Sequence, residues 1–153
     1  MCANIHDGHR KRMREKFYKN GLEAFTDIEA LEMLLFYAVP YRETNTLAHA
    51  LLDKFGSLEN VMAADYNHLI QIDGIGDNTA SIIKFVPEFM RRVQINIGSK
   101  VKVLNSVDNA ASVIKPYLSG KKIEELYMFC LTTKKTLIRV VPLQKGTVDS
   151  VQI

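Results

Sequence analysis

The chain has 153 residues, 47% of them hydrophobic and 24% charged, with a formal net charge of +3. This composition is typical of a globular protein and excludes a disordered chain, and no apolar run approaches the roughly 18 residues that would span a membrane. Cys2 and Cys130 are too few for a disulfide framework, and the N-terminus lacks the apolar run of a secretory signal, so we expect a cytoplasmic protein.

The first predicted element is a basic helix over residues 8–19. Residues 10–19 carry six basic side chains against one acid, while Met13 and Phe17 share the apolar side of the helix. A solvated charged face is the simpler interpretation. The alternative is an arm that contacts phosphates through its first basic side chains, which are Arg10, Lys11 and Arg12.

Capping residues and helix-terminating residues predict a series of short helices after this basic helix. The clearest is a capping box, in which the Thr26 side chain accepts from the Glu29 N–H while Glu29 reaches back. This helix runs through Ala38, ends before Pro40 and is expected to bury Leu31, Leu34, Leu35 and Ala38. Further helices are expected after cap residues, namely Thr44 or Thr46, Ser57 and Asp65, with Gly56 as a C-cap.

Residues 69–84, LIQIDGIGDNTASIIK, predict a short helix, a turn bracketed by Gly74 and Gly76, and a second helix over residues 77–92. Glycine permits positive φ and lets a partner come close to the backbone. The turn leads into a helix N-terminus, where unpaired N–H groups and the positive end of the dipole favour a phosphate. Pro87 should bend the second helix because it has no N–H for the helical ladder. The apolar residues that would lock the two helices together are Leu69, Ile70, Ile72, Ile75, Ala80, Ile82 and Ile83.

The same stretch resembles the helix-hairpin-helix motif, whose pattern is roughly Leu-x-x-Leu-x-Gly-Ile-Gly-x-x-Thr-Ala followed by an apolar pair. The resemblance implies sequence-independent binding to a DNA backbone, with one phosphate held by backbone N–H groups. It also implies that a monovalent cation can bind at the hairpin carbonyls, here those of Ile70, Ile72 and Ile75. The candidate DNA-binding residues of this stretch are Gly74, Ile75, Gly76, Asp77, Asn78, Thr79 and Lys84. Hairpins of this kind also serve as packing units that touch no DNA, and that alternative stays open.

The four histidines are not expected to bind a metal. His6 and His9 have a spacing that a metal could use, but nothing supplies a fourth ligand. His49 and His68 lie inside predicted helices, and we interpret them as surface or core-edge residues.

The composition of the chain changes near residue 98. Residues 100–104 alternate like a strand, and Ser106 is expected to cap a helix over residues 107–118 that buries Ala110, Ala111, Ile114 and Leu118. Further strands are expected at residues 125–132, 136–143 and 147–153. We therefore expect an all-helical domain over residues 1–97 and an incomplete α/β domain over residues 98–153, whose exposed strands favour a homodimer.

Nearly the whole chain resembles the RadC family of bacterial proteins, which is described in general terms as acting in DNA repair. The matching segments are GHRKRMREKF, ALEMLLFYAVPYRETNTLAHALLDKFGSLENVM, the glycine turn, LYMFCLTTKKTLI and KGTVDSV. The resemblance implies an all-α helix-hairpin-helix domain followed by a JAB/MPN-like α/β domain, a metalloprotease-like fold with a zinc site. Its motif, His-x-His-Pro-x-Gly followed by an Asp, is absent here and is expected downstream. Val141 stands near the position of the family's catalytic Glu.

Three functions compete. The first is a DNA-binding module, and the second is a protein-interaction or assembly module that positions a JAB/MPN metallo-hydrolase domain and recruits repair proteins. The second is favoured by residues 20–92, which carry 5 basic against 11 acidic side chains. The third is an enzyme. This chain has no catalytic residues, metal or cofactor that we can assign, whereas the full-length protein would be a zinc metallo-isopeptidase or hydrolase by resemblance.

Overall fold

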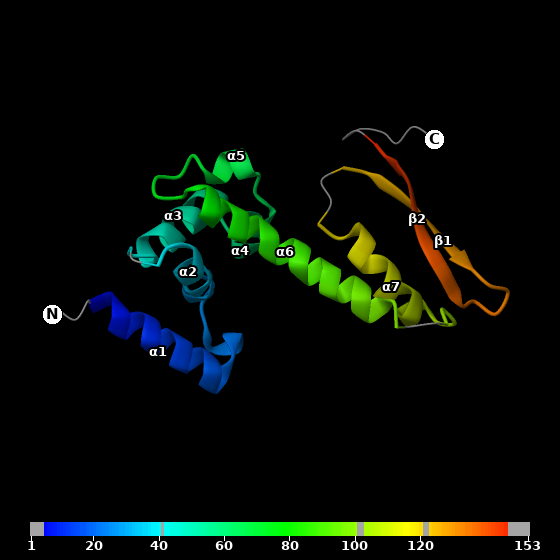
Figure 1. Cartoon of the computed structure of the whole chain (residues 1–153), viewed down its shortest axis with the longest axis horizontal. Coiled ribbons are helices and arrows are strands. Elements are labelled where there is room, and N and C mark those ends of the chain that lie inside the picture. The colour runs from blue at the N-terminus through cyan, green and yellow to red at the C-terminus, as the bar shows by residue number, and fades with distance from the viewer. Residues whose placement is uncertain (1–4, 41, 101–102, 121–122, 147–153) are drawn as a thin grey trace. The chain divides into compact units, whose positions relative to one another are not determined.

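The computed structural model describes residues 5–40, 42–100, 103–120 and 123–146 (Figure 1). The chain divides into two compact units, Met1–Pro87 and Glu88–Ile153. The first unit is helical, and the second contains the end of one long helix, a further helix and a small two-stranded sheet. No helix among the described residues is long and apolar enough to cross a membrane.

The helical unit is built from short helices in chain order. These are α1 (Ile5–Asn20), the 3₁₀ turn η1 (Leu22–Ala24), α2 (Asp27–Ala38), α3 (Asn45–Phe55), α4 (Leu58–Ala63), α5 (Tyr66–Leu69) and the start of α6 (Asp77–Gly98). The predicted capping box opens α2, because the Thr26 side chain accepts from the Glu29 N–H and Glu29 bonds back to the Thr26 N–H. Gly56 is the left-handed C-cap of α3 with φ 82°, and Ser57 caps α4, so these predictions are confirmed.

Helix α2 is buried on two sides, which the sequence pattern did not indicate. Leu31 and Leu35 are fully buried in the main core, while Leu34 and Ala38 are only half-buried. The second side buries Met33 and Phe36, which form a smaller cluster with Met13, Phe17 and Phe25. The prediction of a single stripe was therefore incomplete, because it left out the face that packs against α1.

The main core joins α2, α3, α4, α5 and the start of α6. Its buried residues are Leu31, Leu35, Ala48, Leu51, Val61, Ala64, Leu69, Ile72, Ile75, Ala80 and Ile83. The apolar residues of the glycine turn are thus mostly buried as predicted, but Ile70 is 40% exposed. His49 and His68 are exposed, as expected.

Helix α6 begins at Asp77 as predicted, but it is longer than residues 77–92. It continues past Pro87 to Gly98, a length of 22 residues. Pro87 lies inside the helix, and the predicted bend there stays a prediction. Helix α6 crosses from one compact unit into the other at Pro87 and Glu88, and the domain boundary predicted at residues 97 and 98 stays a prediction.

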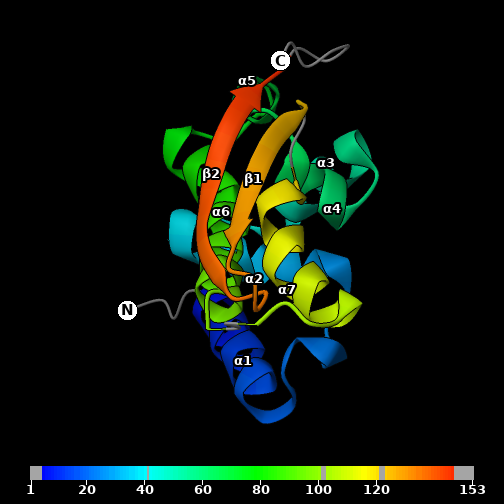
Figure 2. The same ribbon diagram turned by 90° about the vertical axis from the view of Figure 1, so that its right-hand side faces the viewer.

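The second unit pairs two antiparallel strands, β1 (Glu125–Leu131) and β2 (Leu137–Lys145), beside α7 (Val107–Leu118) (Figure 2). Ser106 caps α7 as predicted. The buried face of α7 was predicted wrongly, because Val113 and Pro116 are buried whereas Ala111 and Leu118 are exposed. The ring of Tyr117 packs edge-on against Tyr127 and Phe129 of β1, which turns this side of the helix toward the sheet.

The strands predicted for residues 100–104 and 147–153 are not found as full strands among the described residues. Only an isolated antiparallel bridge, Val103 to Thr136, is present among the described residues of segment 100–104. The strand predicted for residues 147–153 lies outside the described residues. Val141, at the position of the expected Glu, pairs with Met128 in the sheet.

Candidate nucleic-acid interface

The glycine turn, which we define as residues 70–76, leads directly into α6. Gly74 has φ 83°, and a Cβ built on it would lie 2.7 Å from Cδ2 of Leu47. The position therefore favours glycine for its conformation, and an added Cβ would also force the end of the Leu47 side chain to move. Gly76 differs, since its φ is not positive and an added Cβ would meet no atom within 4 Å.

The amides at the start of α6 are the first component of the candidate site. The N–H of Ala80 donates to the Gly76 carbonyl at 3.0 Å, which closes the first turn of the helix. The N–H groups of Asp77, Asn78 and Thr79 precede that bond, so they have no acceptor within their own helix. Ile75 is different, because its N–H donates to the Ile72 carbonyl at 3.0 Å. Of the amides predicted to hold a phosphate, that of Ile75 is thus already engaged.

These amides adjoin an open hollow of about 450 Å³, which we name the turn depression. Its lining joins the α2–α3 connection to the glycine turn and α6. The lining residues are Ala38, Val39, Pro40, Arg42, Gly74, Gly76, Asp77, Asn78 and Thr79.

Thr79 presents a hydroxyl to the turn depression. The residue is only 3% exposed, and no hydrogen bond joins its side chain to another described residue. Every fully enclosed side-chain nitrogen or oxygen atom among the described residues has a partner. The Thr79 hydroxyl must therefore reach the surface of the hollow that Thr79 lines, where it could donate a hydrogen bond to a ligand oxygen.

Asp77 brings a carboxylate to the same hollow. The hydroxyl of Tyr66 donates to Asp77 Oδ1 at 2.5 Å, which links α5 to the start of α6. This hydrogen bond to a carboxylate raises the pKa of Tyr66. The bond partly occupies the Asp77 carboxylate, which would otherwise repel an approaching phosphate more strongly.

Two predicted site residues are engaged elsewhere in the fold. Lys84 is half-buried, and its Nζ donates to the Ala64 carbonyl at 2.8 Å. Arg10 is 8% exposed, and its guanidinium donates to three main-chain carbonyls, those of Phe36 at 3.2 Å, Val39 at 2.6 Å and Arg42 at 2.8 Å. Neither side chain lines the turn depression.

The rest of the basic arm remains on the surface. Lys11 and Arg12 are both exposed, and Lys11 lies 3.9 Å from Glu15 one helical turn later. The predicted basic triplet is therefore split, because Arg10 faces inward while its two neighbours face solvent.

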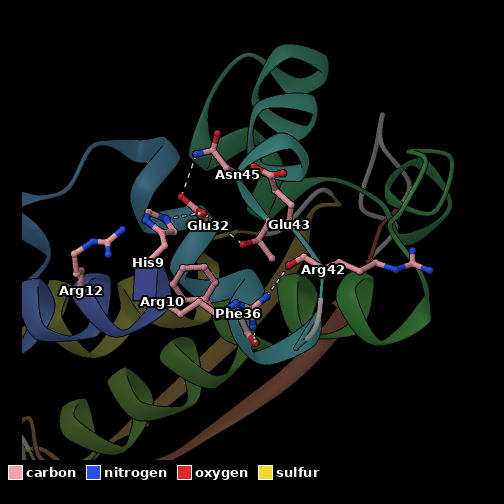
Figure 3. A pocket seen from close by; sticks show the side chains of 9 residues that line it. His9, Arg10, Arg12, Glu32, Phe36, Arg42, Glu43 and Asn45 are labelled. Atoms are coloured by element: carbon pink, nitrogen blue, oxygen red, sulfur yellow. Dashed lines mark hydrogen bonds and ion pairs between the residues drawn. The ribbon is translucent and has the colours of Figure 1, made fainter. Parts of the chain in front are cut away.

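A second hollow of about 330 Å³ lies beside α1 and contains Glu32, a buried carboxylate that the sequence analysis missed (Figure 3). Glu32 is 2% exposed. Its oxygens lie 3.1 Å from Nε2 of His9, 3.1 Å from Nδ2 of Asn45 and 3.5 Å from the Thr44 hydroxyl. Of the two predicted caps, Thr44 and Thr46, it is Thr44 that occupies the N-cap position of α3, but its side chain makes no cap bond. The only signal in the sequence was one acid within the apolar run LEMLLF.

No group of three or more His, Cys, Asp or Glu side chains that could hold a metal occurs in the part of the chain that the structure describes. The predicted monovalent cation at the carbonyls of Ile70, Ile72 and Ile75 stays a prediction, and the Ile72 carbonyl already accepts the Ile75 N–H.

Comparisons with known proteins identify relatives of this chain. A family model described as UPF0758 N-terminal matches residues 7–81, which include the glycine turn and the first residues of α6. A UPF0758 protein of Fusobacterium nucleatum subsp. nucleatum is 34% identical over 97% of this chain and 67% of its own length. A UPF0758 protein of Ruegeria pomeroyi is 31% identical over the whole chain and 68% of its own length. No solved structure matches. The chain therefore belongs to the UPF0758 family.

Proposed function

We propose that this chain is a RadC-like protein whose helical unit is a helix-hairpin-helix domain that binds the DNA backbone without reading its sequence. The Thr79 hydroxyl is the observation that carries the proposal. It is a nearly buried donor without a hydrogen-bond partner among the described residues, at the start of a 22-residue helix and beside N–H groups that also lack helical partners. Such a set of donors suits an anionic oxygen.

The phosphate would enter the turn depression and accept from the amides of Asp77 to Thr79 and from the Thr79 hydroxyl. The exposed side chains of Lys11 and Arg12 would add contacts to neighbouring phosphates. Because these contacts address only the backbone, binding would be weak, salt-sensitive and indifferent to base sequence. Residues 98–153 would begin a JAB/MPN-like domain, and any zinc-dependent hydrolysis would belong to residues beyond this chain.

The substitution Thr79→Val tests the proposal because it removes the hydroxyl and nearly preserves the volume of the side chain. No protein partner loses a hydrogen bond, so we expect the midpoint of thermal unfolding to stay the same or rise. The affinity for a labelled duplex at low salt should fall by at least about ten-fold, in line with the roughly 1.5–3 kcal/mol that hydrogen bonds to charged groups contribute. Fluorescence anisotropy measures the affinity. Equal affinity of the wild type and the variant would show that the hydroxyl does not contact the phosphate.

Protein assembly is the second candidate function, and one observation favours it. Residues 20–92 carry 5 basic against 11 acidic side chains, and three of the basic ones, Lys54, Lys84 and Arg91, already donate to a carbonyl or a carboxylate. A domain with this balance suits a protein partner with a basic surface. If the wild-type chain binds no duplex at about tens of micromolar protein and low salt, assembly becomes the better proposal.

A further inference from the structure

Arg42 is the cationic side chain among the residues that line the turn depression. It lies in the connection between α2 and α3, which is more than thirty positions before Thr79 in the sequence. The residue is exposed, and no ion pair joins its side chain to another described residue. A guanidinium that is both exposed and unpaired beside an amide cluster can bind an anion without first breaking a contact in the protein.

The backbone that carries Arg42 is fixed from the other side by Arg10. Nη2 of Arg10 donates to the carbonyls of Val39 at 2.6 Å and of Arg42 at 2.8 Å, at two points of the same connection. The Arg10 guanidinium also lies 4.9 Å from the centre of the Phe36 ring. These contacts hold the main chain of the connection in one position, which reduces the freedom that Arg42 would lose when it binds.

The Arg42 side chain extends away from the buried carboxylate. Figure 3 shows that the Arg42 carbonyl faces Arg10, whereas the Arg42 guanidinium points to the opposite side from Glu32. Its charge is therefore not used to compensate Glu32, which has His9, Thr44 and Asn45 as partners.

We propose that Arg42 is the residue that completes the phosphate site of the turn depression, with Arg10 as its positioning residue. The proposal rests on the proposed function and adds to it a contact that belongs to no part of the glycine turn. The planar guanidinium binds two oxygens of one phosphodiester, while the amides of residues 77–79 and the Thr79 hydroxyl bind from the helix side. Arg42 also supplies the positive charge that offsets Asp77 in the lining of the hollow.

The test is a salt titration of duplex binding with the full chain and its variants. For the wild type, the logarithm of the binding constant is plotted against the logarithm of the salt concentration. Arg42→Ala should reduce the steepness of this plot by about 0.9, which corresponds to one lost phosphate contact. Arg42→Lys should keep the steepness, because the charge remains. It should bind more weakly, because an ammonium group cannot bind two phosphate oxygens as the planar guanidinium does.

The matched control is Arg139→Ala, which removes an exposed arginine from β2 and should leave the steepness unchanged. Circular dichroism verifies that each variant is folded, and Arg42→Ala should be, because only an exposed side chain is truncated. If Arg42→Ala binds with the wild-type salt dependence while Thr79→Val binds weakly, the role of Arg42 is overturned and the proposed function stands. If the wild type binds no duplex, both proposals fail together.

Discussion

At the scale of single residues, two buried ionic side chains define how α1 attaches to the rest of the helical unit. Arg10 binds three carbonyls at and after the end of α2, and Glu32 lies against His9 of α1. Cations are favoured at helix C-termini because the last carbonyls lack intrahelical donors. A basic residue that looks like part of a DNA-binding arm is therefore a structural residue here, whereas its neighbours are free to act at the surface.

Arg10→Ala should lower the free energy of unfolding by about 3 kcal/mol, because three main-chain carbonyls lose a charged donor, two of them in buried hydrogen bonds. Urea denaturation followed by circular dichroism measures the change. Lys11→Ala is the matched control, since Lys11 is exposed, and it should change the stability by less than about 0.5 kcal/mol. Similar effects of the two substitutions would show that the contacts of Arg10 do not stabilise the fold.

The two glycines of the turn should respond differently to alanine. Gly74→Ala places a Cβ at φ 83° and 2.7 Å from Leu47, so we expect a loss of at least about 1–2 kcal/mol of stability. Gly76→Ala meets open space and should change the stability by less than about 0.5 kcal/mol. Thermal unfolding of both variants measures the contrast, and a stable Gly74→Ala protein would contradict the close packing against α3.

At the scale of elements, the N-terminus of α2 combines a capping box with an ion pair to another helix. Nζ of Lys16 donates to Glu29 Oε1 at 2.6 Å, and the Thr26 N–H donates to the other carboxylate oxygen at 2.9 Å. The Lys16 hydrogen bond is the main cause that lowers the pKa of Glu29, followed by the Thr26 N–H. The same carboxylate thus caps α2 and connects it to α1.

A carboxyl whose pKa is lowered in the folded protein contributes stability above its unfolded pKa, and that contribution disappears as the pH falls through the folded value. Glu29→Gln keeps the ability to cap but removes the charge. We expect the variant to be less stable than the wild type at neutral pH, by less than about 1 kcal/mol because the pair is partly exposed. The difference should shrink once the pH falls below about 4.3. Denaturation at several pH values measures it, and a constant difference would contradict this assignment.

The elements that could be predicted from sequence are those with local causes. The caps at Thr26, Ser57 and Ser106 depend on a residue only three positions later, and the bounds of α7 agree with its cap and its length. The buried face of α7 could not be predicted, because it depends on contacts between Tyr117 and strand β1. The same contrast between local and distant causes holds for the functional candidates. The amides of the turn were predicted from a local pattern, whereas Arg42 and Glu32 come from another part of the sequence.

At the scale of the whole molecule, the chain consists of two units that differ in their basis for stability. All residues of the main core lie between Leu31 and Ile83, within the helical unit. The second unit consists of the end of α6, α7 and two strands, where several large apolar side chains remain exposed, among them Leu118, Ile138 and Leu143. A sheet of two strands is marginal without further packing. Stability should therefore come mainly from the helical unit.

A fragment of residues 1–98, which ends with the last residue of α6, should consequently fold by itself. We expect a helical circular dichroism spectrum, cooperative thermal unfolding and duplex binding comparable to that of the full chain. The full chain, measured in the same buffer, is the control. A fragment without cooperative unfolding would indicate that the core of the helical unit depends on residues after Gly98.

The contacts of Arg10 also have a consequence for folding during synthesis. Its three acceptors lie 26, 29 and 32 positions later in the sequence. Although α1 leaves the ribosome first, it can attach only after the chain through Arg42 has emerged. Until α2 has emerged, the apolar surface of α1 with Met13 and Phe17 lacks Met33 and Phe36, its partners in the smaller cluster. The order of synthesis therefore keeps α1 undocked until the α2–α3 connection has emerged, while α3 to α6 are still to follow.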